Sequence, residues 1–485
     1  MESAPYLTFL LLLADWVVRI GFSVRVILRK RSTGVSLAWL AIVLLIPFVG
    51  AVVYLLVGEN RLGRRRAERL EQVREPYRER LSQMDQGPAI DWSQLPPACQ
   101  VLHRQAYNTI AIPTLDGNRL SLMIDTSEVL EAMSRDIDQA KHSCHVVFYI
   151  WSLGGGANEV AEALMRAAGR GVACRVLLDG VGSYHFLGSE LARRMRGAGV
   201  QLVEALPVNL LRLLFRRLDL RNHRKIMVID GEVAYTGSQN LADARLFKIR
   251  EGVGEWIDAM VRVEGPVVEV LNLIFLADWE LETEIGLEEL QATGDVKQVQ
   301  SRGDTKIQVV PSGPGLAPMV IHEMLLTTIY AAQKELIMTT PYFVPDDAML
   351  MALQAAGHRG VDVTLMVPEK NDSWLVSYAS RSHFDELLLA GVKIARFTKG
   401  LLHAKTITVD RQIGVIGSGN MDMRSFWLNF EVTLFVYGAD FTEQIRDVQM
   451  RYLEQSEFLN TQQWLSRGHR HRFVENCCQL LGPLL

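Results

Sequence analysis

The chain has 485 residues, of which 49% are apolar and 22% are charged, with a formal net charge of −4. This length predicts two or three domains with sizeable cores, and the weakly acidic balance argues against a nucleic-acid partner held by bulk positive charge. The cysteine spacing fits neither a zinc site nor a disulfide framework, so we expect free thiols in a reducing compartment. The five cysteines are Cys99, Cys144, Cys174, Cys477 and Cys478.

The first apolar stretch runs from Tyr6 to Leu28, and its uncharged part ends at Asp15. Asp15 and Arg19 are four residues apart, so we expect them to pair on one face of a helix. Two interpretations stay open: the segment spans a bilayer, or it lies in the interface. A signal peptide is not expected, because no basic region precedes the stretch and no small-residue cleavage site follows it.

The second apolar stretch is Leu37–Gly58, which reads LAWLAIVLLIPFVGAVVYLLVG. Its 22 residues carry no charge. A helix of this length is long enough to cross a hydrocarbon core of roughly 30 Å. Pro47 and Gly50 are tolerated inside such a helix. The sequence therefore predicts a membrane anchor of one or two transmembrane helices in residues 1–60.

Basic residues flank both stretches. Arg29, Lys30 and Arg31 lie between them, and a larger arginine cluster follows from Arg61 to Arg74. The larger cluster favours a cytoplasmic main body, whereas the residues between the stretches argue weakly for the other side if both stretches span. The cluster also suits binding of anionic headgroups or a simple stop-transfer flank, and both interpretations remain.

After a polar connector, taken as residues 61–110, strand-like and helix-like segments alternate and then recur. The alternation predicts an α/β architecture with a largely parallel core. The recurrence predicts two duplicated lobes, at 111–295 and 296–485, the second of which carries a C-terminal tail. The matching strand, helix and strand segments are Cys144–Trp151, Ala157–Ala168 and Val172–Leu178, then Lys334–Tyr342, Asp346–Gly357 and Val361–Val367.

Each half ends in a matching block: NHRKIMVIDGEVAYTGSQN begins at Asn222, and LHAKTITVDRQIGVIGSGN begins at Leu402. Both blocks contain His-x-Lys-x4-Asp followed by Gly-Ser-x-Asn. Chance is a poor explanation for six identities that recur at the same spacings. The recurring residues outside the glycines are His223, Lys225, Asp230, Ser238 and Asn240, then His403, Lys405, Asp410, Ser418 and Asn420.

Each block is predicted to form a strand, a turn at the aspartate and a returning strand. Residues two apart on a strand point to the same face, so His223 and Lys225 project together, as do their counterparts in the second block. Asp230 and Asp410 are included in the predicted catalytic set, with the motif histidines and lysines. Asp230 falls on an Asp-Gly turn, however, and is expected to fix the hairpin. The Gly-Ser-x-Asn loops offer small polar groups that approach an anionic oxygen closely.

Two imidazoles, two ammonium groups and two small polar loops suit a phosphodiester substrate. The ammonium groups and amides stabilise charge on the non-bridging oxygens. One imidazole attacks phosphorus and the other protonates the leaving alcohol. No cluster of carboxylates offers a site for a divalent metal, so metal-independent chemistry without a cofactor is predicted.

The doubled blocks resemble the phospholipase D superfamily, whose signature is two His-Lys-Asp motifs. Nearly the whole chain is similar to the bacterial cardiolipin synthases of that superfamily. The similarity is carried further by RSTGVSLAWL, PFVGAVVYLL, GVGEWID, PYFVPD, GLLHAKT and NFEVTL. The resemblance implies two phospholipase D-like lobes of mixed sheets flanked by helices, and one shared active site at their interface. It also implies a phosphohistidine intermediate and an anchor in the bacterial inner membrane.

The resemblance implies that His223 is the nucleophile and His403 the general acid and later base, although the reverse assignment stays open. It also implies phosphate-binding lysines and asparagines, and downstream carboxylates that orient the histidines. After Asn420 the chain departs from the first block, and Arg424 is expected either to bind a lipid phosphate or to pack the lobes. The implied phosphate ligands are Lys225, Lys405, Asn240 and Asn420, and the implied orienting acids are Asp258 and Glu431.

The expected reaction is therefore transfer of a phosphatidyl group from one phosphatidylglycerol to another, which gives cardiolipin and glycerol at the lipid bilayer. The mixed segment Val208–Leu220 is expected either to lie on the bilayer or to form an ordinary amphipathic element. A hydrolytic phospholipase D, a membrane-tethered nuclease and a non-catalytic scaffold are the rival interpretations. The oligomeric state stays open, as does the tail from Arg467 onward, which docks either on lipid or on the body.

Overall fold

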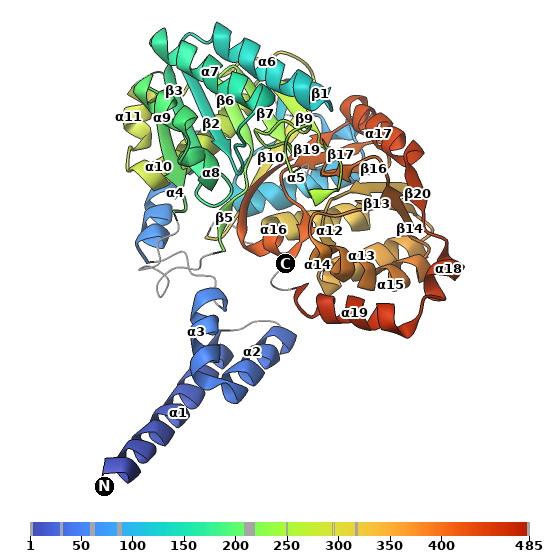
Figure 1. Ribbon diagram of the computed structural model, residues 1–485. Coiled ribbons are helices and arrows are strands. Elements are labelled where there is room, and N and C mark those ends of the chain that lie inside the picture. The colour runs from blue at the N-terminus through green and yellow to red at the C-terminus, as the bar shows by residue number, and fades with distance from the viewer. Residues whose placement is uncertain are drawn as a thin grey trace. The chain divides into compact units, whose positions relative to one another are not determined.

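The computed structural model of the protein describes residues 3–29, 33–58, 64–84, 90–207, 219–248, 251–292, 294, 296–315 and 319–482. The chain forms two compact units (Figure 1). One is Met1–Glu68 with Val208–Leu220, and the other is Arg69–Pro207 with Arg221–Leu485. The predicted bilayer segment Val208–Leu220 lies outside the described residues except for its last two, and so do the flanking basic residues Lys30, Arg31 and Arg61.

The described residues of the first unit form three complete helices, α1 (Ser3–Leu28), α2 (Thr33–Leu45) and α3 (Pro47–Val57). The prediction of one continuous helix over the second apolar stretch is wrong, because the chain breaks at Ile46, where φ is −132° and ψ is 69°. Pro47 supplies no backbone N–H and disfavours a helical conformation in the residue before it. Among the described residues, no helix combines the length and the apolar character that crossing a bilayer requires.

The three helices pack on one another. The predicted pairing of Asp15 with Arg19 is confirmed, at 2.6 Å, and the Arg19 guanidinium also donates to the carbonyl oxygen of Leu44 on α2. Val26, Trp39 and Tyr54 form a small buried cluster between the helices. Most other apolar side chains of this unit are exposed, since three helices cannot bury them.

The second unit is built on one 16-stranded sheet flanked by helices. The strands are β1 (Leu115–Met123), β2 (Ser143–Phe148), β3 (Ala173–Asp179), β4 (Gln201–Ala205), β5 (Arg221–Asn222), β6 (Ile226–Ile229), β7 (Val233–Gly237), β9 (Met260–Glu264), β10 (Thr305–Ser312), β11 (Glu335–Thr339), β13 (Asp362–Pro368), β14 (Lys393–Phe397), β16 (Thr406–Val409), β17 (Ile413–Gly417), β19 (Asn429–Tyr437) and β20 (Ser456–Phe458). Four short strands pair outside it, namely β8 (Trp256–Ile257) with β15 (Leu401–Leu402), and β12 (Phe343–Val344) with β18 (Met421–Asp422).

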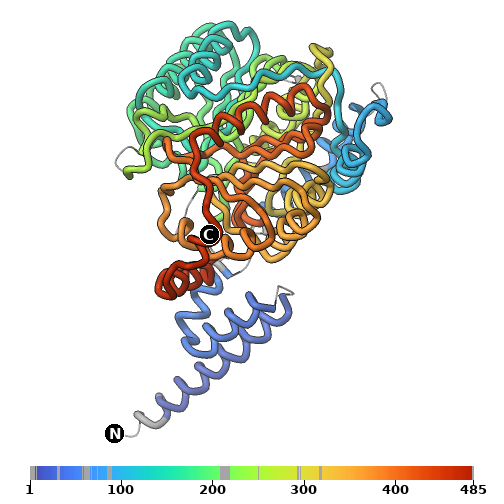
Figure 2. Tube along the Cα trace, turned by 90° about the vertical axis from the view of Figure 1, so that its right-hand side faces the viewer, coloured from blue at the N-terminus to red at the C-terminus, as the bar shows by residue number. Residues whose placement is uncertain are grey.

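Helices cover both halves of this sheet (Figures 1 and 2). In the first half they are α4 (Arg64–Met84), α6 (Thr126–Gln139), α7 (Gly155–Gly169), α8 (Tyr184–Leu187), α9 (Glu190–Gly197), α10 (Val267–Thr283) and α11 (Leu287–Ala292). In the second they are α12 (Val320–Ala331), α13 (Asp347–His358), α14 (Trp374–Ser382), α15 (Phe384–Leu389), α16 (Met423–Trp427), α17 (Ala439–Glu454), α18 (Thr461–Leu465) and α19 (His469–Gln479). The 3-10 helix η1 (Trp92–Gln94) and α5 (Pro97–Ile110) come early in the chain but pack against the core of the second half.

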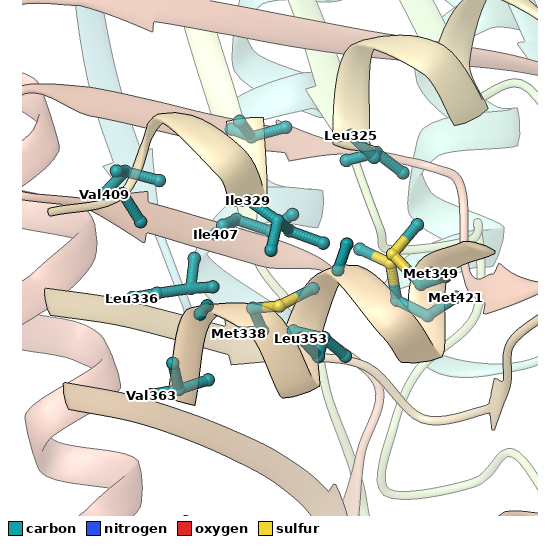
Figure 3. Packing of buried hydrophobic residues seen from close by; sticks show 14 of the residues in the cluster. Leu325, Ile329, Leu336, Met338, Met349, Leu353, Val363, Ile407, Val409 and Met421 are labelled. Carbon is teal, nitrogen blue, oxygen red and sulfur yellow. The ribbon is translucent and has the colours of Figure 1, made fainter. Parts of the chain in front are cut away.

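The strand order repeats from the centre of the sheet outward, which is the duplication expected from the matching blocks. One half runs β1-β9-β7-β6-β2-β3-β4, and the other runs β10-β19-β17-β16-β11-β13-β14. The predicted strands and helices of both halves are present, with ends shifted by one to three residues. In the second half, the apolar faces of α12, α13 and the strands beside them close into one core that includes Ile329, Met338, Leu353 and Ile407 (Figure 3).

The expectation of a largely parallel core is wrong. Parallel pairing is confined to the sets β2-β3-β4 and β11-β13-β14 and to the short strand β5 beside β19, within the described part of the sheet. The centre is antiparallel because each motif block folds into a hairpin, β6-β7 or β16-β17, and hairpin strands necessarily run in opposite directions. The α/β class holds, with a mixed sheet.

The aspartates of the two motifs fix these hairpins. Asp230 and Asp410 lie at the turns with positive φ values of 53° and 48°. The Asp230 carboxylate accepts three backbone N–H groups, from residues 141 to 143, and the Asp410 carboxylate accepts three from residues 333 to 335. Their place in the predicted catalytic set is therefore corrected, because each carboxylate ties its hairpin to the start of the neighbouring strand.

Asp230→Ala and Asp410→Ala are each expected to lower stability and to leave catalysis intact. Each substitution removes the acceptor of three backbone N–H groups, which should lower the free energy of unfolding by about 1–3 kcal/mol. Thermal unfolding followed by intrinsic fluorescence should show a lowered melting temperature. The KM and kcat of the folded fraction should match those of the unchanged protein. A large kcat loss at unchanged stability would instead return these carboxylates to the chemistry.

Candidate active site

The two motif segments cross between the halves of the sheet. Strand β5, just before the first motif histidine, pairs in parallel with the start of β19 in the second half. Strand β15, just before the second, pairs in parallel with β8 in the first half. The backbone N–H of His223 donates to the carbonyl oxygen of Phe430 at 2.9 Å, and that of His403 donates to Ile257 at 2.7 Å. Each histidine is thus held by the backbone of the opposite half.

The crossing also exchanges the orienting acids. His223 Nδ1 lies 2.9 Å from Glu431 Oε2, and His403 Nδ1 lies 2.6 Å from Asp258 Oδ1. An ionised carboxylate only accepts, so Nδ1 carries the proton in both rings and Nε2 keeps its lone pair for a substrate. The two acids picked out by resemblance are therefore in contact with the histidines, each across the boundary between the halves.

The motif serines bind these acids. Ser238 Oγ donates to Asp258 at 2.6 Å and accepts from the backbone N–H of Ala259 at 2.9 Å. Ser418 Oγ donates to Glu431 at 2.5 Å, in the equivalent arrangement. Of the two roles open to these serines, phosphate binding or support of the site, the hydrogen bonds fit support, because each hydroxyl holds a carboxylate that in turn binds a histidine. The glycine before Ser238 is required because an added Cβ would lie 2.4 Å from the carbonyl oxygen of Ala259.

The motif lysines lie buried beside the histidines. Lys225 Nζ donates to the carbonyl oxygen of His223 at 2.7 Å, and Lys405 Nζ to that of His403 at 2.6 Å. In each motif the histidine and the lysine lie in the short segment between β5 and β6, or between β15 and β16, and not on a regular strand as predicted. Burial lowers the pKa of Lys225 to about 8 and that of Lys405 to about 7, although the nearby acids oppose the shift.

Burial likewise lowers the pKa of both histidines to about 4, against the opposing effect of the carboxylate that each one binds. Burial alone would raise the pKa of Glu431 and Asp258, but the histidine and the lysines hold both near 2. The resting site therefore contains two neutral imidazoles and two ionised carboxylates at neutral pH. Each imidazole is ready to attack or to accept a proton, and its carboxylate stabilises the imidazolium that forms.

Activity is expected to decline as the pH rises above about 7. The Lys405 ammonium loses its proton as the pH passes through its lowered pKa, and the neutral amine no longer stabilises an anionic phosphate. Lys405→Arg should move this alkaline limb of kcat/KM to higher pH, because a guanidinium stays charged. The measurement is kcat/KM between pH 6 and 10 for both proteins. An unmoved limb would assign the loss to another group.

The motif asparagines lie at the same centre and are buried. Asn240 Oδ1 accepts from the backbone N–H of Ile150 at 3.2 Å. The backbone N–H of Asn420 donates to Ser425 Oγ at 3.0 Å, and its Oδ1 is buried without a hydrogen-bond partner in the described part of the chain. A phosphate contact by their side-chain N–H groups stays a prediction.

Three aromatic rings surround the histidines and were missed by the sequence reasoning. Tyr149 meets His223 edge-on at 4.9 Å between ring centroids, Trp256 lies 4.4 Å from His403, and Tyr342 lies 6.4 Å from it. A signal was present, since each of the two matched strand segments has a tyrosine among its last three residues, Tyr149 and Tyr342. These rings exclude water, which strengthens every charge interaction in the site.

A buried ion pair supports the first motif from behind. Arg224 donates to Asp278 on α10 at 2.5 Å, and its Nε donates to the carbonyl oxygen of Glu431 at 3.1 Å. The Asn222 amide also donates to Asp278, at 3.0 Å. Asn222 and Arg224, the two residues that flank His223, are thus both bound to Asp278. Nothing in the sequence distinguished this arginine from a surface residue.

Comparison with known proteins agrees with this geometry. The family described as "Cardiolipin synthase, PLD-like domain" matches residues 133–279 and 325–451, and "Phospholipase_D-nuclease N-terminal" matches residues 17–59. Cardiolipin synthase A of Pectobacterium atrosepticum is 44% identical, with 99% of both chains covered. The same enzyme of Yersinia pseudotuberculosis is 43% identical, with 97% of both chains covered.

A solved structure shares the fold. Phosphatidylserine synthase of Haemophilus influenzae superposes with a TM-score of 0.60 over 79% of this chain and all of its own, at 14% identity. At that identity the likeness concerns the fold alone. Sequence identity over nearly the full length of these cardiolipin synthases, and a family match over both halves, show which family the chain belongs to. The chain belongs to the cardiolipin synthase family of phospholipase D-like proteins.

Proposed function

We propose that the protein transfers a phosphatidyl group from one phosphatidylglycerol to the terminal hydroxyl of another, which forms cardiolipin and releases glycerol. The observation that carries the proposal is the pair of neutral imidazoles, each bonded through Nδ1 to a buried carboxylate of the opposite half. Membership in the cardiolipin synthase family supports this product over others that the same chemistry can make.

In the first half of the reaction, His223 Nε2 attacks the phosphorus of the donor lipid. His403, protonated as substrate binds, gives its proton to the departing glycerol oxygen. Lys225 and Lys405 stabilise the charge that builds on the non-bridging oxygens, and Asn240 and Asn420 are the further phosphate ligands. Glu431 stabilises the positive charge on the phosphohistidine ring, because it already accepts from its Nδ1.

In the second half, the acceptor hydroxyl replaces glycerol. His403 Nε2 takes the proton from the incoming hydroxyl, and the alkoxide attacks the phosphorus of the phosphohistidine. His223 leaves as a neutral imidazole. One phosphodiester is broken and one is formed, so no nucleotide or external energy source is needed.

We infer that residues 111–295 and 296–485 are the two lobes, that 1–60 anchor the enzyme in the bacterial inner membrane and that 61–110 connect the two. The anchor is supported by the apolar surface of α1, where Phe9, Trp16 and Val17 are more than half exposed. It is also supported by the N-terminal family match over residues 17–59. An apolar surface of this extent is stable in contact with lipid.

The test is a product assay with the purified full chain in phosphatidylglycerol liposomes. We expect cardiolipin and glycerol in equal amounts without added nucleotide or metal. Phosphatidic acid as the main product would identify a hydrolytic phospholipase D. Cleavage of DNA with no change in the lipid would identify a nuclease, and no turnover of either would leave a scaffold.

A further inference from the structure

The C-terminal helix α19 lies against the body through one face only. Glu475 and Cys478 are buried, and Cys478 packs with Val344 and Ala379 in a small apolar cluster beside α14. Glu475 also accepts from Arg467 at 2.8 Å. The tail was expected to dock either on lipid or on the body, and in the structure α19 docks on the body.

The opposite face of α19 is apolar and exposed. Phe473, Val474 and Cys477 lie on it at spacings of three and four residues, and Leu480 and Leu481 continue it past the end of the helix. Phe473 is 70% exposed and Leu480 is 81% exposed. Scattered apolar residues on a surface need no explanation, but a continuous stripe with helical periodicity marks a face that meets an apolar partner.

The charge around the stripe indicates what that partner is. Between residues 467 and 482 the chain carries three arginines and two histidines against a single acid, Glu475. That acid is buried and paired with Arg467, which also binds Asp385, and Arg472 lies 3.7 Å from Asp385. The exposed charge at the start of α19 is therefore that of Arg470, beside two exposed histidines. A basic helix end next to an exposed Phe and Leu face is the pattern of a helix that lies in the surface of an anionic bilayer. A second copy would bring the same basic ends together.

A short series of contacts links α19 to residues 372–374, which we take as the rim of the active site. α14, which packs against α19, begins at Trp374, whose side chain is 67% exposed. Two residues earlier, Asp372 accepts from the hydroxyl of Tyr342 at 2.8 Å, and the Tyr342 ring faces His403. A bilayer whose headgroups contact Trp374 and α19 would therefore lie close to the active site.

We propose that the exposed apolar stripe of α19, together with Trp374, is a second membrane-contact surface that docks the catalytic unit on a bilayer of anionic phospholipid. The surface holds the rim of the active site at headgroup level, so that a lipid phosphate reaches the histidines while its acyl chains stay in the bilayer. This last role rests on the proposed lipid substrate, whereas the docking itself does not.

The docking is tested with the full chain in phosphatidylglycerol vesicles. Cys477 is exposed and the other four cysteines are buried, so an environment-sensitive thiol probe labels Cys477 selectively. We expect a blue-shifted emission, and at least about twofold quenching by spin-labelled acyl chains, as for a residue seated in the interface. The matched control carries the probe at Glu131→Cys in a Cys477→Ser background. Glu131 lies on α6, at the far end of this unit in Figure 1, with 71% of its side chain exposed.

Quenching at Cys477 no greater than at the control would overturn the proposal. So would an oxidative Cys477–Cys477 cross-link in vesicles without quenching, because it would assign the stripe to a second copy. Neither result depends on turnover, so both stand even if the proposed reaction fails.

The role at the rim is tested with Phe473→Ser/Leu480→Ser. We expect the rate on long-chain phosphatidylglycerol in vesicles to fall at least about fivefold, from the lost apolar contact, with an unchanged rate on a short-chain, monomerically dissolved analogue. Val101→Ser, at another exposed apolar residue on α5, should change neither rate. An equal loss on both substrates, or no loss on either, would overturn the role.

Discussion

Replacing His223 by alanine is expected to abolish formation of the covalent intermediate, whereas replacing His403 is expected to block only the steps that need proton transfer. Both substitutions should lower turnover on phosphatidylglycerol by roughly 10⁴–10⁶-fold, as for residues that act as one unit. Turnover alone therefore cannot separate the roles. A phosphatidyl ester of p-nitrophenol can, because nitrophenolate departs without being protonated.

With that ester, His403→Ala should release one equivalent of nitrophenolate in a burst and then stop with a phosphatidyl group on His223. His223→Ala should give no burst. Rapid-mixing absorbance measures the burst, and mass spectrometry of the quenched protein locates the adduct. The opposite pattern would exchange the two roles, and a burst from both variants would contradict the phosphohistidine mechanism.

The second large effect is expected because each orienting carboxylate binds the histidine of the opposite half. Glu431→Gln should behave like a defect of His223, and Asp258→Asn like a defect of His403, because those are the rings that they contact. An amide keeps the shape but can hold the wrong tautomer and cannot stabilise an imidazolium, so each variant should lose roughly 10²–10⁴-fold in kcat.

The nitrophenyl ester separates these two variants as well. Glu431→Gln should slow the burst itself, while Asp258→Asn should keep a fast burst and lose only later turnover. Ser238→Ala and Ser418→Ala serve as graded controls, because each removes one hydrogen bond to the same acid and should cost roughly tenfold or less. A slow burst in Asp258→Asn with a fast one in Glu431→Gln would contradict the crossed arrangement.

The crossing makes catalysis depend on both halves together. His223 takes its backbone partner, through Phe430, and its orienting acid, Glu431, from the second half, and His403 takes its own from the first. Neither half therefore holds a complete histidine–carboxylate pair of its own. The two halves are joined where β1 pairs with β10, where β5 pairs with β19 and where β15 pairs with β8.

The sequence by itself determined the chemistry and the duplication. Two copies of His-x-Lys-x4-Asp and Gly-Ser-x-Asn predict the reacting groups, because their residue types and spacing are local properties of the chain. The hairpin turn at Asp230 could be predicted for the same reason, since an Asp-Gly pair between two apolar runs specifies a turn. The strands and helices of each half followed from their periodicity to within a few residues.

Tertiary structure alone decided which groups meet. Glu431 contacts His223 across 208 residues of chain, and Asp258 contacts His403 across 145. These pairings depend on β5 and β15 joining strands of the opposite half, and no local pattern encodes such long-range register. The break of the second apolar stretch at Pro47 was likewise open from sequence, since proline is tolerated in a helix when neighbours satisfy the freed backbone groups. The apolar face of α19 became visible only once its other face was seen to be buried.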